Sequence, residues 1–564
     1  MDNPLYVTLN DLFSRLDPRW DDTCAEWLQA LILANQQGHV CLPVPQPSAR
    51  QRLGACPLVA APGGYAPLIL DAQSGLYFAR HWFDEARLAD ALRLKTGRRA
   101  TVSPVDAAHW LDRLFPPTAE GLDRQKLAAA LALRQRLLVI SGGPGTGKTT
   151  TVIRLLALLA ALAAQPLVMA LAAPTGKAAA RLSDSMRGAI AQLPVEAALK
   201  QRLPDSAQTL HRLLGLRPGG GRPRHHADNT LPLDVLVVDE ASMIDLDLMA
   251  RTFDALPPHA QVILLGDRDQ LASVEAGAVL GELCQDIGYR GETLAWLAAL
   301  GMDVDELPAA IDEGAPMTDC VVLLTRSHRF AAASGIGQFS RAVNDNRPDE
   351  ALALLDEAAA DLSWHPQWDA DALWARRQPY WQAVAAGAPL TSVQQAFVAF
   401  MPLAGERRQV EAINRLVEHR LEADGLKMPG QLWYPGRPVM ISHNDYGVGL
   451  FNGDIGFAVD RPEGLRVAFP AADGSWRELA PARLPAHDTV YAMTVHKSQG
   501  SEFDEVWLVL PDEEANVPDR ALVYTAVTRA RQRFRLVGGR EMLRAAIGHA
   551  LVRHSGLARR MRPT

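Results

Sequence analysis

Short apolar runs of strand type recur through the first half of the chain, and longer stretches with helical character separate them. The runs are Arg136–Ile140, Pro166–Ala172, Asp234–Val238, Gln261–Leu265 and Cys320–Leu324. Apolar runs without polar alternation are typical of strands that are buried on both faces. Their separation by helices predicts a parallel, doubly wound α/β sheet.

A second set of strand-like runs follows a helical, tryptophan-rich stretch, and a different pattern interrupts it. The runs are Gln395–Met401, Thr489–Thr494, Glu505–Leu510 and Arg533–Val537. Between them, Gln431–Pro485 is dense in short strands and turns, which predicts a small β-barrel inserted into a second α/β unit. The glycine-rich segment Pro218–Asn229 is typical of an exposed hairpin tip in the first unit.

The N-terminal region carries no catalytic pattern. Gly38–Val44 and Pro67–Ala79 are expected to be strands and His81–Arg93 an amphipathic helix, which predicts a small α+β domain. We therefore expect an N-terminal domain over residues 1–115. A first α/β domain is expected over 116–335, with a hairpin near 217–230, and a second over 336–564, with an insert at about 430–486.

The segment Ser141–Thr151 reads SGGPGTGKTTT and fits the phosphate-binding loop G-x-x-x-x-G-K-[ST]. Glycines let successive backbone N–H groups point at phosphates, Lys148 would reach the β- and γ-phosphates, and Thr149 would bind Mg²⁺. A strand-like run precedes the loop and a helical run follows it, as such a loop requires. The residues expected to bind nucleotide here are Gly142, Gly143, Pro144, Gly145, Thr146, Gly147, Lys148, Thr149 and Thr150.

Polar signatures follow each predicted strand of the first sheet. Asp239 and Glu240 end the run VLVV, where the first acid suits Mg²⁺ and the second suits the attacking water. Gln270 ends LLGDRDQ and is expected to sense the γ-phosphate. Because ligands bind at the carboxyl ends of parallel strands, we expect these signatures to form one site.

Two arginines are candidates for stabilising the charge that develops in phosphoryl transfer. Arg329 lies in RSHRF and Arg529 in VYTAVTRAR, both outside the first nucleotide half-site. A guanidinium group in this role contributes about 10³–10⁵ in rate. Supplied from across a cleft, the pair would make hydrolysis depend on closure between two domains.

A third class of motif combines hydroxyl residues, glycines and single cations, which suits gripping a phosphodiester backbone without reading bases. Each of these motifs is also compatible with a simple helix cap or turn. The candidate DNA contacts are Thr175 and Lys177 in APTGKAA, Thr209 and His211 in TLHRLL, and Thr494 and His496 in AMTVHKSQG.

Composition narrows the setting. The chain has 564 residues and a net charge of −7, which argues against nonspecific adhesion to nucleic acid but allows a narrow basic channel. Its five cysteines are widely spaced without a C-x-x-C pair, so we expect neither a zinc site nor disulfides. The start lacks a signal-peptide pattern, and the only long apolar stretch contains Arg154, so a cytoplasmic protein is expected.

The ordered motifs resemble those of superfamily 1 helicases, and specifically the branch that moves 5′→3′. They are GGPGTGKTT, APTGKAAARL, TLHRLLG, VVDEASMID, LLGDRDQLASVEAG, SHRF, AMTVHKSQGSEFD and VYTAVTRARQR. The segments around the acidic pair and WYPGRPVMISHNDYGVGLFNGDIG are also similar to the RecD family, the alpha subunits of exodeoxyribonuclease V (RecBCD). This likeness runs from about Leu114 to the C-terminus.

The resemblance implies a specific protein class. It implies two RecA-like motor domains with an SH3-like insert, ATP and Mg²⁺ as cofactors, and a heterotrimer with RecB-like and RecC-like subunits that unwinds DNA ends in recombinational repair. It also places Gln125 at the adenine. His328 stands where the branch often has an aromatic residue. Two alternatives are weighed against this class. The RecD-like segment Trp433–Gly456 argues against a stand-alone 5′→3′ helicase, and the loop lysine, both acids and both arginines argue against a structural subunit without ATPase activity. A nuclease gains little support, because we find no separate carboxylate–lysine cluster.

Overall fold

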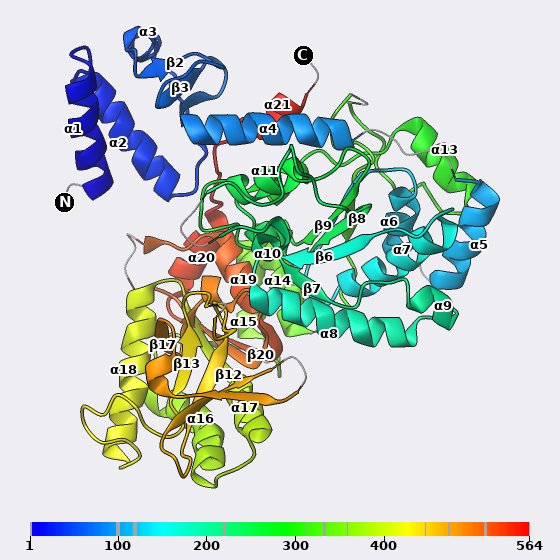
Figure 1. The fold of residues 1–564 in the computed structure, drawn as a ribbon. Coiled ribbons are helices and arrows are strands. Elements are labelled where there is room, and N and C mark those ends of the chain that lie inside the picture. Colours follow the sequence, from blue (N-terminus) through cyan, green and yellow to red (C-terminus); the bar gives the residue numbers. More distant parts are fainter. Residues whose placement is uncertain are drawn as a thin grey trace.

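The computed structural model describes most of the chain, and Figure 1 shows its arrangement. The described residues are 3–96, 102–116, 121–217, 221–312, 314–330, 334–357, 359–445, 447–471, 474–512 and 516–562. They form an N-terminal α+β domain, two parallel-sheet domains and an antiparallel sheet inserted in the second of these. The predicted fold class, α/β with two RecA-like domains, is thereby confirmed.

The N-terminal domain pairs short strands with helices. Its sheet has the order β1-β4-β3-β2, and β3 and β4 form an antiparallel hairpin. Helix α4 leaves this sheet and packs along α11 (Leu246–Asp254) of the first motor domain, across the top of that domain in Figure 1. The elements are α1 (Pro4–Leu16), α2 (Asp22–Gln36), β1 (Cys41–Leu42), α3 (Pro47–Ala55), β2 (Val59–Ala60), β3 (Leu68–Asp71), β4 (Gly75–Phe78) and α4 (Ala79–Lys95).

The first motor domain is built on a parallel sheet of order β10-β5-β9-β8-β6-β7. Every residue of β8 and β9 is buried, as continuous apolar strands covered on both faces require. The strands are β5 (Leu137–Gly142), β6 (Met169–Ala173), β7 (Ala207–Thr209), β8 (Val235–Val238), β9 (Gln261–Gly266) and β10 (Val321–Leu324). The helices are α5 (Pro104–Leu114), α6 (Arg124–Ala132), α7 (Lys148–Leu162), α8 (Gly176–Gln192), α9 (Ala197–Lys200), α10 (Leu210–Leu214), η1 (Ala241–Met243), α11 (Leu246–Asp254), α12 (Val279–Leu283) and α13 (Gly291–Ala299).

The second motor domain repeats the parallel architecture with the order β11-β20-β19-β12-β18. Its strands are β11 (Leu362–His365), β12 (Phe400–Ala404), β18 (Met493–Thr494), β19 (Phe503–Val509) and β20 (Ala530–Val537). Its helices are α14 (Gly335–Asn344), α15 (Pro348–Asp356), α16 (Ala370–Ala385), α17 (Leu390–Val398), α18 (Arg407–Ala423), η3 (His496–Ser498), α19 (Arg520–Val527) and α20 (Arg540–Gly548).

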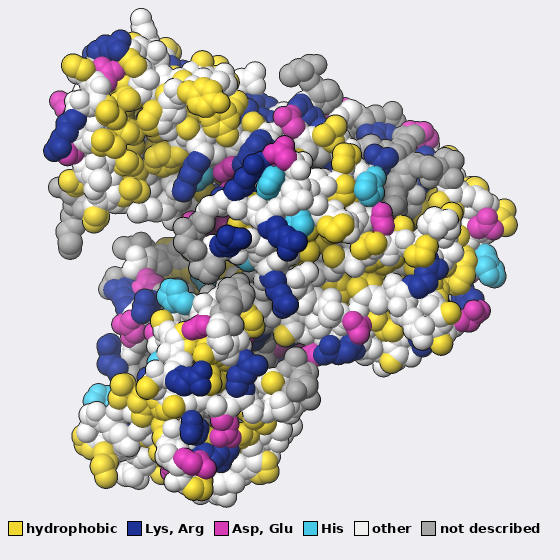
Figure 2. Space-filling view, in the orientation of Figure 1, with side chains coloured by type: hydrophobic (Ala, Val, Ile, Leu, Met, Phe, Trp, Pro, Cys, Tyr) yellow, Lys and Arg dark blue, Asp and Glu magenta, His cyan; other side chains and the backbone are white. Residues whose placement is uncertain are grey.

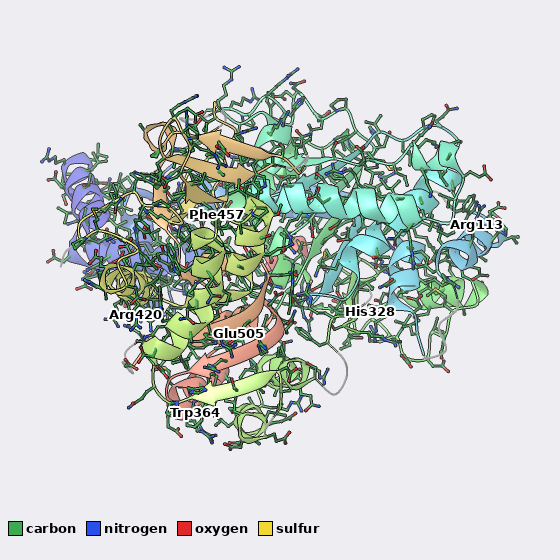
Figure 3. All side chains as sticks on the ribbon, turned by 90° about the horizontal axis from the view of Figure 1, so that it is seen from below. Arg113, His328, Trp364, Arg420, Phe457 and Glu505 are labelled. Atoms are coloured by element: carbon green, nitrogen blue, oxygen red, sulfur yellow. The ribbon has the colours of Figure 1, made fainter. Side chains whose placement is uncertain are left out.

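The inserted sheet lies between α18 and β18 and has the order β16-β15-β14-β13-β17, with every neighbouring pair antiparallel. Phe457 of this sheet packs against Tyr380 of α16 and Phe397 of α17, and Figure 3 labels it where the insert meets these helices. The elements are β13 (Pro438–Ile441), β14 (Ile455–Val459), β15 (Arg466–Pro470), β16 (Trp476–Leu479), η2 (Pro481–Arg483) and β17 (His487–Thr489).

The C-terminal tail, which we define as residues 549–562, returns from α20 to the N-terminal domain and ends in α21 (Leu557–Met561). The backbone N–H of Val40 donates to the carbonyl of His554 at 2.9 Å. Glu85 of α4 is fully buried and accepts from the backbone N–H of Gly556 at 2.8 Å and from Nε of Arg560 at 2.7 Å. The tail therefore joins the second motor domain directly to the N-terminal domain, and Figure 1 shows α21 beside α4.

Two predicted strands need correction. Thr489–Thr494 is not one strand, because Thr489 ends β17 of the inserted sheet and β18 covers only Met493–Thr494. Gln395–Met401 is not one strand, because residues up to Val398 belong to α17 and the strand begins at Phe400. Val393 and Phe397 are both buried and stand four residues apart, which is helical spacing. The short edge strand β7 was not predicted. Of the expected hairpin tip, residues 218–220 lie outside the described residues, and the remainder contains a backbone bridge between His226 and Asn229.

All five cysteines lie in the described part of the chain, and all are free and buried. Among the residues that the structure describes, no helix is both long and apolar enough to cross a membrane.

Candidate nucleotide-binding cleft

The loop between β5 and α7 has the conformation that its glycines permit. Gly145 and Gly147 have φ angles of 77° and 82°, in the left-handed region that favours glycine. A Cβ on Gly147 would lie 2.4 Å from Nε2 of Gln125, and that amide donates to the carbonyl of Thr146 at 3.2 Å. Lys148 donates through Nζ to the carbonyl of Gly142 at 2.5 Å. Gln125 therefore lies against the loop, at the side where α7 begins.

The acidic pair follows β8. Glu240 has a φ of 52°, an unusual value for a residue with a side chain, which costs about 1–3 kcal/mol and is typical of functional sites. Asp239 accepts the backbone N–H of Glu240 at 2.9 Å. Burial and the adjacent carboxylate of Glu240 raise the pKa of Asp239, whereas Lys148 opposes the shift. A cation placed here would relieve both carboxylates.

Gln270 is held by a buried carboxylate at the end of β9. Its Nε2 donates to Oδ2 of Asp267 at 3.0 Å, and the hydroxyl of Tyr524 donates to the same oxygen at 3.1 Å. Because Tyr524 belongs to α19, this carboxylate connects Gln270 to the second motor domain. Burial raises the pKa of Asp267.

The two predicted arginines lie in the same cleft but come from different domains. Arg529 follows α19, is 3% exposed, and donates from Nε to the carbonyl of Thr525 at 3.2 Å. Arg329 follows β10, a strand of the first sheet, and the backbone N–H of its neighbour His328 donates to the carbonyl of Gly145 at 2.8 Å. The expectation that Arg329 is supplied from across the cleft is therefore wrong, because its backbone rests on the phosphate loop itself.

The cleft between the motor domains has a volume of about 330 Å³. Figure 3 places His328, next to Arg329, on the side of the first motor domain that faces the second. Predicted residues line the cleft together with Arg181, Ser185 and Glu502, which sequence reasoning did not assign. The predicted lining residues are Pro144, Gly145, Thr146, Gly147, Lys148, Thr149, Thr150, Asp239, Glu240, Gln270, Arg329 and Arg529.

The sequence gives only a partial signal for Arg181 and Glu502 as cleft residues. Arg181 ends the motif APTGKAAAR, and Glu502 follows KSQGS in the motif AMTVHKSQGSEFD. Helical spacing separates Arg181 from Lys177, so the two long side chains share one face of α8. Nothing in the sequence shows that this face turns toward the second motor domain.

The three threonines among the candidate DNA contacts share one geometry. Thr175 follows β6, and Thr209 and Thr494 are the last residues of β7 and β18. Each Oγ1 accepts a backbone N–H three residues further on, at 3.2 Å for the first two and 3.3 Å for Thr494. Each hydroxyl therefore caps a helix or helical turn, as the alternative interpretation allowed. A capping hydroxyl still has its own O–H to donate, so a phosphate oxygen remains a possible partner.

The cations of this group lie in different environments. Nζ of Lys177 donates to Oγ of Ser501 in the second motor domain at 2.6 Å, and burial lowers the pKa of Lys177 to about 8. His211 is exposed on α10. His496 is half-buried, and burial lowers its pKa below the usual histidine value.

All five predicted strand-end signatures contribute residues to the cleft, so the expectation of one site is confirmed, whereas the candidate DNA contacts lie apart from it. β5, β9 and β8 are neighbours in the sheet and β10 flanks β5, and the loops after these strands carry the cleft residues. β6 and β7 are the outer strands on the other side, where Thr175 follows β6 and Thr209 is the last residue of β7. Helix α8 connects the two groups of residues. Its Arg181 lines the cleft, whereas its Lys177 is one of the candidate DNA contacts outside the cleft.

Two parallel-sheet domains with a phosphate loop and arginines in the cleft between them define a P-loop motor ATPase fold. The AAA domain family matches residues 125–276, and the UvrD-like helicase C-terminal domain family matches residues 489–537. These ranges contain the cleft residues of the first and second motor domains, except Arg329.

Known proteins identify the family. A RecBCD enzyme subunit RecD from Mycolicibacterium smegmatis is 40% identical over 536 residues, which cover 93% of this chain and 88% of that protein. An ATP-dependent RecD2 DNA helicase from Deinococcus radiodurans is 31% identical over 464 residues, covering 81% of this chain and 55% of that protein. The solved structure of Pif1 helicase from Candida albicans is 15% identical, with a TM-score of 0.41, and the match covers 76% of this chain and 97% of that one. The chain belongs to the RecD family.

Proposed function

We propose that this protein is the ATP-dependent 5′→3′ DNA helicase subunit of a RecBCD-type complex that unwinds double-stranded DNA ends. The observation that carries the proposal is the cleft itself. It combines a phosphate loop, an acidic pair and arginines at the boundary of two motor domains. Such an arrangement makes hydrolysis sensitive to domain closure, which is how a motor couples ATP turnover to movement.

The cleft residues have distinct proposed roles. Lys148 and the loop N–H groups bind the phosphates, Gln125 contacts the adenine, and Gln270, Arg329 and Arg529 respond to the γ-phosphate. Thr149 and Asp239 fit Mg²⁺, since both line the cleft and offer oxygen ligands, and the carboxylate of Asp239 lies beside that of Glu240. Bound Mg²⁺ neutralises charge on the phosphates. Glu240 orients the attacking water and accepts its proton.

ATP hydrolysis by the full chain tests the nucleotide site. Lys148→Gln should abolish DNA-stimulated hydrolysis, because the phosphates lose their cation. Glu240→Gln should keep nucleotide binding and lose turnover, because the amide cannot accept a proton. Nucleotide binding is measured with a fluorescent ATP analogue. Unchanged hydrolysis in Lys148→Gln would refute the site, and a parallel loss of affinity in Glu240→Gln would assign Glu240 to the fold or the metal.

We also propose that single-stranded DNA lies across the outer strand ends. Thr175, Thr209 and Thr494 would donate their hydroxyls to phosphates, Lys177 would supply positive charge, and His211 and His496 would donate ring N–H groups. The 5′→3′ polarity rests on the family motifs. A displacement assay with labels at either end of a single-stranded track tests it, and movement toward the 5′ end would contradict the proposal.

The N-terminal domain is the proposed contact for the partner subunits, of which a RecC-like subunit is our candidate. Leu5, Leu12 and Leu16 of α1 are 50%, 46% and 60% exposed, and their spacing puts them on one face of the helix. Figure 2 shows hydrophobic side chains gathered over α1 and α2, in the upper left. An exposed apolar stripe of this kind is typical of a protein interface.

Co-purification with RecB-like and RecC-like subunits tests this surface. Leu12→Glu should abolish assembly and leave the DNA-stimulated ATPase unchanged, whereas Leu94→Glu, which alters an exposed leucine on α4, should assemble normally.

The stand-alone helicase is the second candidate function, and the likeness to the RecD2 helicase favours it. A monodisperse isolated chain that unwinds DNA processively without partners would favour it over the subunit proposal.

A further inference from the structure

The cleft contains a carboxylate that phosphate binding does not require. Glu502 precedes β19, and its side chain is 14% exposed. Its Oε1 accepts from Nη2 of Arg329 at 2.7 Å and from Nη2 of Arg181 at 3.0 Å, and its Oε2 accepts from Nε of Arg531 at 3.2 Å. Arg181 and Arg329 together lower the pKa of Glu502 to about 2 against the effect of burial, so the group is an anion at any physiological pH.

The arginines that meet at Glu502 come from both motor domains. Arg181 lies on α8 and Arg329 follows β10, so both belong to the first domain, whereas Glu502 and Arg531 belong to the second. Arg181 also donates through Nη1 to the carbonyl of Gly500. Arg329 reaches the carbonyl of Thr528 at 3.5 Å. The carboxylate of Glu502 in the second domain therefore forms ion pairs with two arginines of the first domain across the domain boundary.

We propose that Glu502 is a positioning residue that fixes Arg329 and Arg181 across the cleft and so sets their placement for the γ-phosphate. The inference rests on the proposed ATP site. A guanidinium group holds its donors in a rigid fork, so a bidentate or shared carboxylate fixes its direction as well as its charge. Since a displacement of about 1 Å in a positioned group costs about 100-fold in rate, loss of this anchor should act on turnover.

The inference predicts that kcat and KM for ATP both fall when Glu502 loses its charge. Glu502→Gln keeps the shape of the side chain but removes its charge. Arg329 then loses its anchor, and kcat for DNA-stimulated ATP hydrolysis should fall about 100-fold. The cleft also becomes more positive, so KM for ATP should fall as well. Glu502→Asp keeps the charge on a shorter stem and should restore part of kcat.

A charge-matched control separates positioning from net charge. Asp184 lies on α8 with Arg181, and its side chain is 59% exposed and pairs with Arg187. Asp184→Asn removes one negative charge from the same helix and should leave kcat and KM at the wild-type values. A circular-dichroism melt of each variant shows whether it is folded. If Glu502→Gln does not fold, the comparison of Glu502→Asp with the wild type decides the question through the same kcat and KM measurements.

The full chain is assayed alone or co-expressed with its partner subunits, and Lys148→Gln is measured in parallel. The inference is supported if Lys148→Gln is inactive and Glu502→Gln has a lower kcat and a lower KM than the wild type. A raised KM with unchanged kcat in Glu502→Gln would overturn the inference, because Glu502 would then be a direct nucleotide contact. Unchanged kcat and unchanged KM would also overturn it. Wild-type hydrolysis by Lys148→Gln would instead overturn the proposed ATP site.

Discussion

Replacing Arg560 with alanine should release the C-terminal tail from the N-terminal domain. The guanidinium of Arg560 pairs with Glu85 at 2.7 Å and with Asp71 at 2.8 Å, and it lies 4.7 Å from the ring centroid of Trp82. Its side chain is 15% exposed, and that of Glu85 is fully buried. Arg560→Ala therefore leaves a buried carboxylate without its cation.

The expected loss of stability in the tail contact follows from the burial of the Glu85 carboxylate. Removing one partner of a buried ion pair costs about 3–5 kcal/mol, because the remaining charge stays in a site of low polarity. Glu85 keeps hydrogen bonds from Tyr77, Ser555 and Gly556, and Asp71 keeps Arg559, so the loss should lie near the lower end. A loss of about 3 kcal/mol corresponds to roughly a 100-fold rise in tail opening.

Hydrogen exchange measured by mass spectrometry reports this local opening directly, whereas global melting of a multidomain chain does not. Peptides covering residues 553–562 should exchange about 100-fold faster in Arg560→Ala. The control is Arg562→Ala. Arg562 pairs with Asp286 at 3.5 Å with both side chains about 60% exposed, so its loss should cost under about 1 kcal/mol. Equal exchange in the two variants would refute the assignment of a buried ionic anchor.

Two further predictions concern pH and the phosphate loop. Burial beneath the tail and the nearby Glu85 raise the pKa of Glu282 to about 8. The folded chain then retains a proton that the unfolded chain releases, so this contribution to stability is complete at acid pH and is lost as pH rises to about 8. The difference in Tm between wild type and Glu282→Gln should grow from pH 5 to pH 9, and a constant difference would contradict it. Gly145→Ala should lower DNA-stimulated ATP hydrolysis, since φ is 77° and the new Cβ would lie 2.4 Å from Cβ of Arg329. Gly188→Ala, in open space on α8, should hydrolyse ATP normally, and equal activity of the two variants would disprove the steric argument.

The first motor domain shows which strands an apolar sequence pattern can predict and which it cannot. Continuous buried runs such as Val235–Val238 predict strands well, because a strand covered on both faces must be apolar throughout. β7 could not be found in this way. It spans Ala207–Thr209, without an apolar run, and exists because its backbone pairs with the edge of β6.

The sequence by itself determined the phosphate loop, the acidic pair and most of the cleft, because these residues are local motifs at strand ends. The tertiary structure decided which groups meet over long separations. It placed Arg329 on its own domain's phosphate loop, brought Glu502 to Arg181 across 321 positions, and brought Arg560 to Glu85 across 475 positions. The physical reason is that an ion pair depends on distance and burial, and neither is encoded in the identity of a single charged residue.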